Sequence, residues 1–197
     1  MAVPVTSEVD IVAIEWDVRI ERAFTLESVR SATESVLAEL LGLDNALAVS
    51  ATESDTPERR GAELAPERMA AAHGPFPGET EHVSFHLDGI DATVWVLIAE
   101  TEIEEQYADE DDEDVWPHWC SVECQRDPES VVLGIATIIA VARVAGRKVW
   151  DEVRQLGLER ISDPEDLVRA LRVSGAPDLE SAVRAVLART GITFGER

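Results

Sequence analysis

The sequence predicts an α+β protein: an antiparallel sheet of about four to six strands, with a buried apolar helix and C-terminal helices on one face. Three observations lead to this fold class. Runs of alternating apolar and polar residues mark strands, and an Asp-Gly pair between two such runs marks a hairpin. The expected order of elements, β-α-β-β-β-β-α-β-α-α, gathers strands in succession and so favours antiparallel pairing.

The N-terminal part begins with a strand and a capped helix. Residues 14–20 alternate between apolar and charged side chains, as a half-buried strand does. Thr25 has the residue type of a helix N-cap, and the apolar stripe after it predicts a helix to about residue 41, with Gly42 as its stop. Residues 45–52 are expected to form a second, short strand.

Residues 53–80 contain four prolines and three glycines. This composition predicts a long mobile connection with one short helix near residues 66–72.

A hairpin follows this connection. Asp88-Gly89 separates two alternating runs, and both residue types tolerate the positive φ that a two-residue turn requires. Such a turn places Val83, Phe85 and Leu87 on the core face. On the opposite face it pairs His86 with Asp91, Ser84 with Thr93, and His82 with Trp95.

The rest of the chain contains a helix that is apolar nearly all round, so other elements must cover this helix on more than one side. We expect the following segments: an acidic tract over 100–114, a strand over 115–126, the apolar helix from Asp127-Pro128 to about residue 145, an extended stretch at 147–151, and amphipathic helices at 162–173 and 177–190. Residues 1–150 are expected to form an acidic α+β core. Residues 151–197 are expected to form a helical segment packed on it, within the same domain.

The negative charge lies in the front part of the chain. Residues 1–127 carry thirty acidic and seven basic residues, whereas residues 128–197 carry ten of each, so the first part holds the whole net charge of −23. Such a field repels nucleic acid and anionic membranes and attracts cationic proteins. Halophilic adaptation and codon usage that favours Arg are alternative explanations, since Lys148 is the single lysine.

The sequence predicts a cytoplasmic protein. Met1 to Pro4 lack the basic segment and apolar run of a secretory signal. The apolar stretch 131–142 is shorter than the ~18 residues that a membrane span needs. Two cysteines make no disulfide framework, as is usual in a reducing compartment.

Catalytic and cofactor motifs are missing from the sequence. It has no G-x-S-x-G, no H-E-x-x-H, no phosphate-cradling glycine loop and no dinucleotide fingerprint, so we predict no enzyme class and no cofactor. Cys120, Cys124 and His118 are metal-ligand types, but strand residues four apart lie ~13 Å from each other, too far for one zinc ion or a disulfide. We expect buried free cysteines; a helical conformation of this segment would reverse that judgement.

Candidate partner-binding residues fall into two groups. Trp95, Trp119 and His82 are expected on the sheet face away from the apolar helix, with Asp91 beside them. Exposed tryptophans there mark an interface, unless segment 53–80 or a C-terminal helix covers them.

The second group is a run of carboxylates that forms either a solvated loop or a docking site for a basic partner. A calcium loop is disfavoured, because an EF-hand requires Gly where this run has Asp114. The run consists of Asp109, Glu110, Asp111, Asp112, Glu113 and Asp114.

The segment Ala145-Gly146-Arg147-Lys148-Val149-Trp150-Asp151-Glu152, which follows the apolar helix, resembles the immunity proteins of bacterial polymorphic toxin systems. In such families a helix is followed by a small-residue turn and then by a hydrophobic and an acidic residue. The resemblance implies a compact, acidic, cytoplasmic α+β protein that neutralises a basic toxin domain.

We therefore expect a non-enzymatic acidic binding protein, immunity-like or inhibitor-like, whose partner is a basic protein such as a toxin or nuclease. Two alternatives stay open. One is an enzyme of unrecognised family with a pocket near the hairpin at residues 82–95, and the other is a self-associating structural or virion component.

Overall fold

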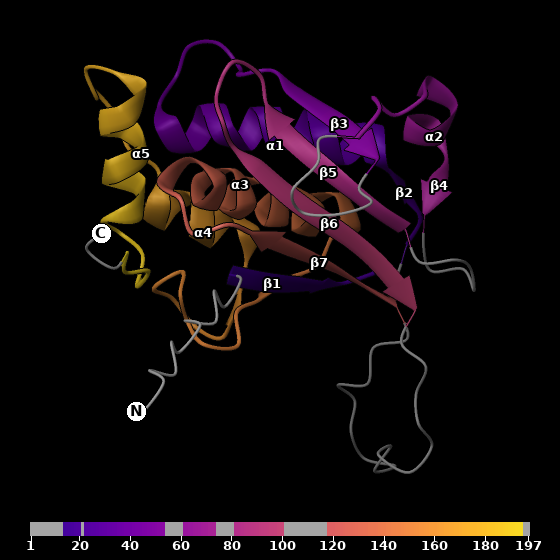
Figure 1. The fold of residues 1–197 in the computed structure, drawn as a ribbon. Coiled ribbons are helices and arrows are strands. Elements are labelled where there is room, and N and C mark those ends of the chain that lie inside the picture. The colour runs from indigo at the N-terminus through magenta and orange to yellow at the C-terminus, as the bar shows by residue number, and fades with distance from the viewer. Residues whose placement is uncertain (1–13, 21, 54–60, 74–80, 101–117, 195–197) are drawn as a thin grey trace, which may run out of the picture.

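The computed structural model describes residues 14–20, 22–53, 61–73, 81–100 and 118–194 (Figure 1). In chain order its elements are β1 (Ile14–Arg19), β2 (Phe24–Thr25), α1 (Leu26–Leu41), β3 (Val49–Glu53), α2 (Pro66–Ala70), β4 (Ala72–His73), β5 (Glu81–Leu87), β6 (Thr93–Glu100), β7 (His118–Cys124), α3 (Pro128–Ala145), β8 (Val149–Trp150), β9 (Ile161–Ser162), α4 (Pro164–Leu171) and α5 (Leu179–Leu187).

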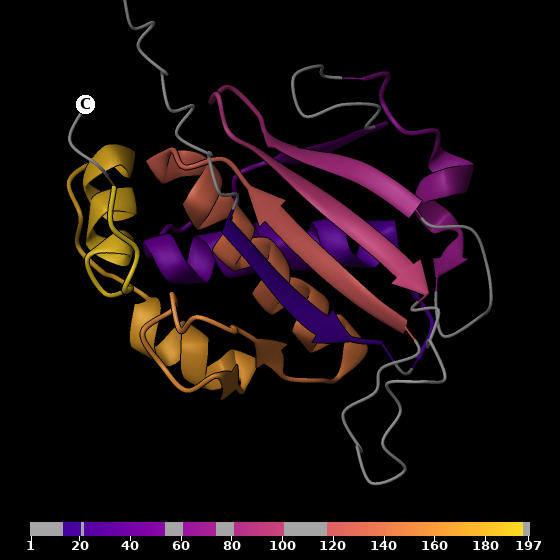
Figure 2. The same cartoon turned by 60° about the horizontal axis from the view of Figure 1, so that its bottom comes forward.

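The described strands form a seven-stranded antiparallel sheet in the order β3-β5-β6-β7-β1-β8-β9, and β2 and β4 pair separately. Helices α1, α3, α4 and α5 lie on one side of the large sheet (Figures 1 and 2). The predicted α+β class is therefore confirmed. The sheet has more strands than predicted, because β8 and β9 extend one edge by two short strands.

The ends of the two long helices are determined by local sequence. The Thr25 side chain accepts a hydrogen bond from the Ser28 backbone N–H at 3.1 Å, and the Ser28 hydroxyl reciprocates, so α1 begins in a capping box. Asp127 caps α3 through the Ser130 N–H at 2.8 Å. Both helices end at a glycine in the left-handed region, Gly42 with φ 64° and Gly146 with φ 69°.

Helix α3 is the centre of the hydrophobic core. On one side it contacts the strands β1, β6 and β7, and on its other sides it contacts the helices α1, α4 and α5. These contacts explain why its sequence is apolar nearly all round. Gly134 faces the sheet, and a Cβ there would lie 3.0 Å from the Trp16 ring and 3.2 Å from the Cys124 sulfur. Of the described helices, α3 is the one long and apolar enough to cross a membrane, and it lies mostly buried inside the fold.

The β5–β6 hairpin corrects the predicted register. His86 pairs with Thr93, Ser84 with Trp95 and His82 with Leu97. All three expected pairs, His86 with Asp91, Ser84 with Thr93 and His82 with Trp95, are therefore wrong by two residues. The turn contains four residues rather than two, because Leu87 donates its N–H to Ala92 O at 3.2 Å. A shift of two residues keeps the side chains that remain in the strands on their predicted faces, whereas Asp91 moves into the turn.

Part of the connection predicted as mobile has a described position. Leu64 and Met69 are buried, and Leu64 donates its N–H to the backbone oxygen of Ala51 in β3 at 3.0 Å. This contact places residues 61–73 against α1 and the β3 edge. Residues 54–60 and 74–80 of the connection lie outside the described part of the chain.

Strand β3 forms one edge of the sheet, and α1 side chains bind its outward backbone groups. Glu34 accepts a hydrogen bond from the Val49 N–H at 3.0 Å, and Arg30 donates to the Val49 carbonyl at 3.3 Å. An ion pair of 2.7 Å joins Arg30 to Glu34. The polar backbone atoms of Val49 are therefore satisfied without another strand.

The C-terminal segment packs on the helical layer. Its α4 and α5 contact both α1 and α3, and Val173 donates its N–H to Leu40 O at 2.8 Å. The Arg143 guanidinium joins three helices, because it binds Glu39 of α1 at 2.9 and 3.0 Å and Glu165 of α4 at 2.8 and 3.0 Å.

The loop between β8 and β9 is organised by one buried carboxylate. Asp151 Oδ1 accepts a hydrogen bond from the Gln155 N–H at 3.0 Å, and Oδ2 accepts one from Leu156 at 2.6 Å. Asp151 is 1% exposed and also donates its own N–H to Arg160 O at 2.8 Å. Asp151 therefore has a structural role, which is to organise the loop between β8 and β9.

Candidate protein-docking face

The sheet face opposite α1 and α3 carries the predicted tryptophans, and we call it the outer face. In the central strands β5, β6, β7 and β1, outer-face side chains alternate with those of the core. Figure 2 shows these strands with the helices gathered behind them. The outer face of these strands and of β8 includes His82, Ser84, His86, Trp95, Leu97, Trp119, Ser121, Glu123, Glu15, Asp17 and Trp150.

Trp95 and Trp119 are both half-buried, so the described structure neither encloses them nor leaves them fully exposed. Trp95 comes from β6 and Trp119 from β7. Leu97, which pairs with Ser121, occupies the row between them and is also half-buried. The three side chains follow a diagonal across two strands and give this face an apolar stripe. Leu97 was not among the predicted site residues.

A group of carboxylates adjoins this stripe. Glu15 of β1 and Glu123 of β7 are directly opposite each other, and Glu123 is in turn paired with Trp95 of β6. The Ser121 hydroxyl donates to Glu15 Oε1 at 2.7 Å. Asp17 occupies the next row, where it pairs with Ser121 on one side and Trp150 on the other. The face thus brings carboxylates and indole rings into adjacent positions.

Burial and neighbouring charge disfavour the ionisation of Asp17 and Glu123. Burial, followed by repulsion from Glu15, raises the pKa of Asp17 to about 6, and Glu152 and Glu123 add to the increase. A hydrogen bond with Ser121 offsets only part of it. Burial and Glu15 also raise the pKa of Glu123, which nearby His82 partly opposes. Among the described residues, no basic side chain stabilises the Asp17 carboxylate, and its buried Oδ1 has no hydrogen-bond partner.

The other predicted site residues have mixed positions. His82 is exposed and lies on the outer face opposite Leu97. Asp91 is exposed in the hairpin turn, outside the paired strands. His86 is buried, with Nε2 2.7 Å from Thr52 Oγ1 and Nδ1 2.9 Å from Thr93 Oγ1. Its two ring nitrogens therefore contact threonine hydroxyl groups on the neighbouring strands β3 and β6.

The acidic run that was predicted to dock a basic partner lies outside the described residues. It belongs to segment 101–117, which connects Glu100 at the end of β6 to His118 at the start of β7. Glu100 and His118 pair with each other. The predicted site residues in this run are Asp109, Asp111, Asp112, Glu113 and Asp114.

The two cysteines are free and face the core, as expected from a strand. Burial raises the pKa of the Cys124 thiol to about 12 and raises that of Cys120 further. Thiolates are therefore scarce at neutral pH, which makes these residues poor nucleophiles and poor metal ligands. Within the described residues, no three His, Cys, Asp or Glu side chains are placed to hold a metal ion.

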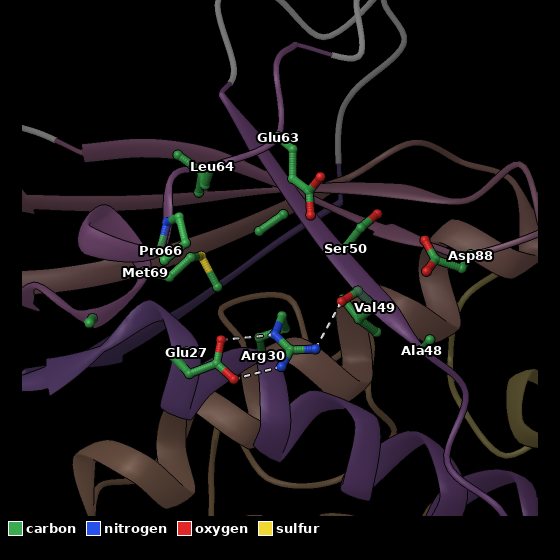
Figure 3. Close-up of a pocket in the computed structure, with 12 residues that line it drawn as sticks. Glu27, Arg30, Ala48, Val49, Ser50, Glu63, Leu64, Pro66, Met69 and Asp88 are labelled. Atoms are coloured by element: carbon green, nitrogen blue, oxygen red, sulfur yellow. Dashed lines mark hydrogen bonds and ion pairs between the residues drawn. The ribbon is translucent and has the colours of Figure 1, made fainter.

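A hollow of about 510 Å³ lies between β3, α1 and α2 (Figure 3). Leu64 and Met69 contribute to its apolar wall. Glu27 and Arg30 form a bidentate pair with distances of 2.6 and 3.1 Å, so these two charges largely neutralise each other. No histidine is among the described residues that line this hollow, and it supplies no pair of a histidine and a carboxylate for catalysis.

The carboxylates of the outer face were missed by the sequence analysis, although one signal was available. Alternation within their strands places Glu15, Asp17 and Glu123 opposite the core side chains. The sequence does not reveal that β1 pairs with β7, and this pairing brings the three together.

Comparison of the chain with protein-family models, curated proteins and solved structures finds no match.

Proposed function

We propose that this protein is a non-enzymatic, cytoplasmic binding protein that docks a basic protein on its outer face, in the manner of an immunity protein or inhibitor. The proposal has one principal support. Glu15, Asp17 and Glu123 lie together on the sheet face opposite the helices, and burial, followed by repulsion from Glu15, raises the pKa of Asp17 to about 6.

The free energy of docking follows from this electrostatic arrangement. When the pKa of a carboxyl group is raised, its charged form is less stable in the protein than it would be in water. An Arg or Lys side chain of a partner, placed beside Asp17 and Glu15, would remove that penalty and form charge-assisted hydrogen bonds. The net charge of −23 adds long-range attraction, which accelerates encounter with a basic protein.

The apolar stripe supplies the second component of such an interface. Trp95 and Trp119 are half-buried in the free protein and have apolar area left to bury, and Leu97 lies between them. Indole rings surrounded by polar groups are typical of interface hot spots. A partner that presents a basic side chain next to an apolar one fits this face.

Self-association through the same face is disfavoured by its charge. Two copies meeting face to face would bring Glu15, Asp17 and Glu123 near an equally acidic surface, with a further electrostatic cost. Light scattering that shows a stable dimer at physiological salt would support the structural alternative instead.

The test compares two immobilised variants with the same change in net charge. The face variant carries Glu15→Gln, Asp17→Asn and Glu123→Gln. The control carries Asp44→Asn, Glu67→Gln and Glu180→Gln, three exposed carboxylates outside the strands of the outer face. The product of the adjacent gene and a lysate are each passed over both variants at low and high salt.

We expect the wild-type protein and the control to retain a basic protein, and the face variant to lose it. Retention should weaken as salt increases, because exposed charges are screened. A partner that binds the face variant as well as the control, or one with an acidic binding surface, would overturn the proposal.

A further inference from the structure

A second hollow, of about 760 Å³, lies at the end of the sheet where α3 ends and α4 begins. Its wall comes from β1, from the turn between α3 and β8, and from β8, β9 and the first residues of α4. Pockets for small molecules typically have ~300–1,000 Å³, so this hollow is large enough for a ligand of nucleotide size.

The charge of this hollow is opposite to that of the molecule. Four basic side chains line it, Arg19, Arg143, Arg147 and Lys148, against two acidic ones, Asp163 and Glu165. The complete chain has 40 acidic and 17 basic residues. A hollow with a surplus of positive charge is therefore a local exception that an anion would find favourable.

The two acidic side chains are already engaged within the protein. Asp163 Oδ1 caps α4 by accepting the Glu165 N–H at 2.9 Å, and both carboxylate oxygens of Glu165 accept hydrogen bonds from Arg143. Lys148 is exposed and forms no hydrogen bond or ion pair with any described residue. Its ammonium group is available to a ligand.

One wall of the hollow is apolar. Trp150 and Ile161 are opposite each other on β8 and β9, and both line the hollow. Ile161 is 46% exposed, which makes it one of two large apolar side chains that are exposed in the described structure. The Arg160 guanidinium lies over the Trp150 ring, 4.8 Å from its centroid, and this contact orients the ring.

We propose that this hollow binds a phosphate-bearing small molecule with a flat apolar body, of the nucleoside di- or triphosphate class. Lys148 binds the phosphate groups, and Arg19 and Arg147 add positive charge beside them, since ammonium and guanidinium are the usual protein partners of phosphate. Trp150 and Ile161 contact the flat body. Trp150 and Arg19 line this hollow and also lie on the outer face beside Asp17, so the hollow adjoins the proposed docking face and differs from it in its basic lining.

The test titrates the full chain with ATP, pyrophosphate and adenosine in Mg²⁺-free buffer, by calorimetry and by ¹⁵N–¹H correlation spectra. Two charge reversals are compared, Lys148→Glu in the hollow and Arg184→Glu on α5, where the side chain is exposed and lies outside the residues that line the hollow. Both lower the net charge equally. An unchanged spectrum away from the substitution establishes that each variant is folded.

We expect ATP to bind saturably, to shift the amides of Lys148 and Trp150, and to bind more tightly than pyrophosphate or adenosine. Loss of one charge-assisted contact should weaken ATP binding by about tenfold in Lys148→Glu, whereas Arg184→Glu should bind as the wild type does. Equal effects of the two reversals would assign the binding to the overall field and overturn the site. No saturation below ~10 mM ATP would also overturn it. Equal affinity for ATP and pyrophosphate would overturn the contact of the flat body with Trp150.

Discussion

Glu15 of β1 lies directly opposite Glu123 of β7, so two like charges form a cross-strand pair on the outer face. Such pairs destabilise a sheet when nothing compensates them. The Ser121 hydroxyl donates to Glu15 at 2.7 Å, and Asp17 in the next row has its pKa raised to about 6. This arrangement makes the stability of the free protein depend on pH in a way that experiments can test.

Asp17→Asn should stabilise the protein at pH 8 by about 1–2 kcal/mol and should have little effect at pH 4. The pKa of Asp17 is about 6 in the folded protein, which is higher than in the unfolded chain. Asp17 therefore contributes its full stabilisation of the fold below about pH 4, and this stabilisation is lost as the pH rises through 6. Urea unfolding at pH 4, 6 and 8 measures this difference. A gain that is the same at all three pH values would contradict the assignment.

Glu27→Gln is a control for which stability is expected to change with pH in the opposite direction. A hydrogen bond from Arg30 holds the pKa of Glu27 below its usual range, so its contribution is present at neutral pH and is lost on acidification. This variant should be less stable than the wild type at pH 8, and the difference should disappear at low pH.

Arg143→Met should lower the free energy of unfolding by about 1–2 kcal/mol, because it removes paired hydrogen bonds to two carboxylates and retains the apolar stem. Arg143 binds Glu39 and Glu165, and these contacts hold α3 to α1 and α4. Urea unfolding gives the value. Arg184→Met, which breaks an exposed pair within α5, should cost under about 0.5 kcal/mol, and a similar cost for both variants would refute the role of Arg143.

Asp151→Ala should destabilise the protein by about 2 kcal/mol, because it leaves the buried N–H of Leu156 and the N–H of Gln155 without their acceptor. Hydrogen exchange should show lost protection at these two amides before protection falls elsewhere. Asp151→Asn keeps one carbonyl oxygen and should recover part of the loss. Full protection of both amides in Asp151→Ala would show that the loop does not depend on this carboxylate.

Gly134→Ala should destabilise the protein by about 1–2 kcal/mol, although alanine has the higher helix propensity by about 1 kcal/mol. The added methyl group would lie 3.0 Å from the Trp16 ring and 3.2 Å from Cys124 Sγ, in a core with little room to adjust. Combining it with Cys124→Ala removes the sulfur and should recover part of the loss in a double-mutant cycle. Strictly additive effects would show that the sulfur contact does not carry the cost.

Features encoded by neighbouring residues could be predicted from the sequence. The caps at Thr25 and Asp127 and the stops at Gly42 and Gly146 require only the residue type and its position next to an apolar stripe. The same holds for the face of each strand residue, which follows from alternation. These rules were enough to predict the α+β class.

Features that depend on pairing between distant segments could not be predicted in the same way. The hairpin register was wrong because four residues, Asp88 to Asp91, form the turn where the sequence signal favours two. The carboxylate group was missed because Glu15 and Glu123 meet only when the first strand pairs with β7. Local periodicity contains no information about which strands are neighbours.

The capped backbone of Val49 determines how another chain can reach this sheet. Because Glu34 and Arg30 occupy its outward N–H and C=O, an incoming peptide cannot extend the sheet by β-augmentation at that position. At this end of the sheet a partner must instead engage side chains, so recognition there depends on shape and charge rather than on a shared backbone ladder. The same protection lowers the tendency of two copies to join edge to edge at high concentration.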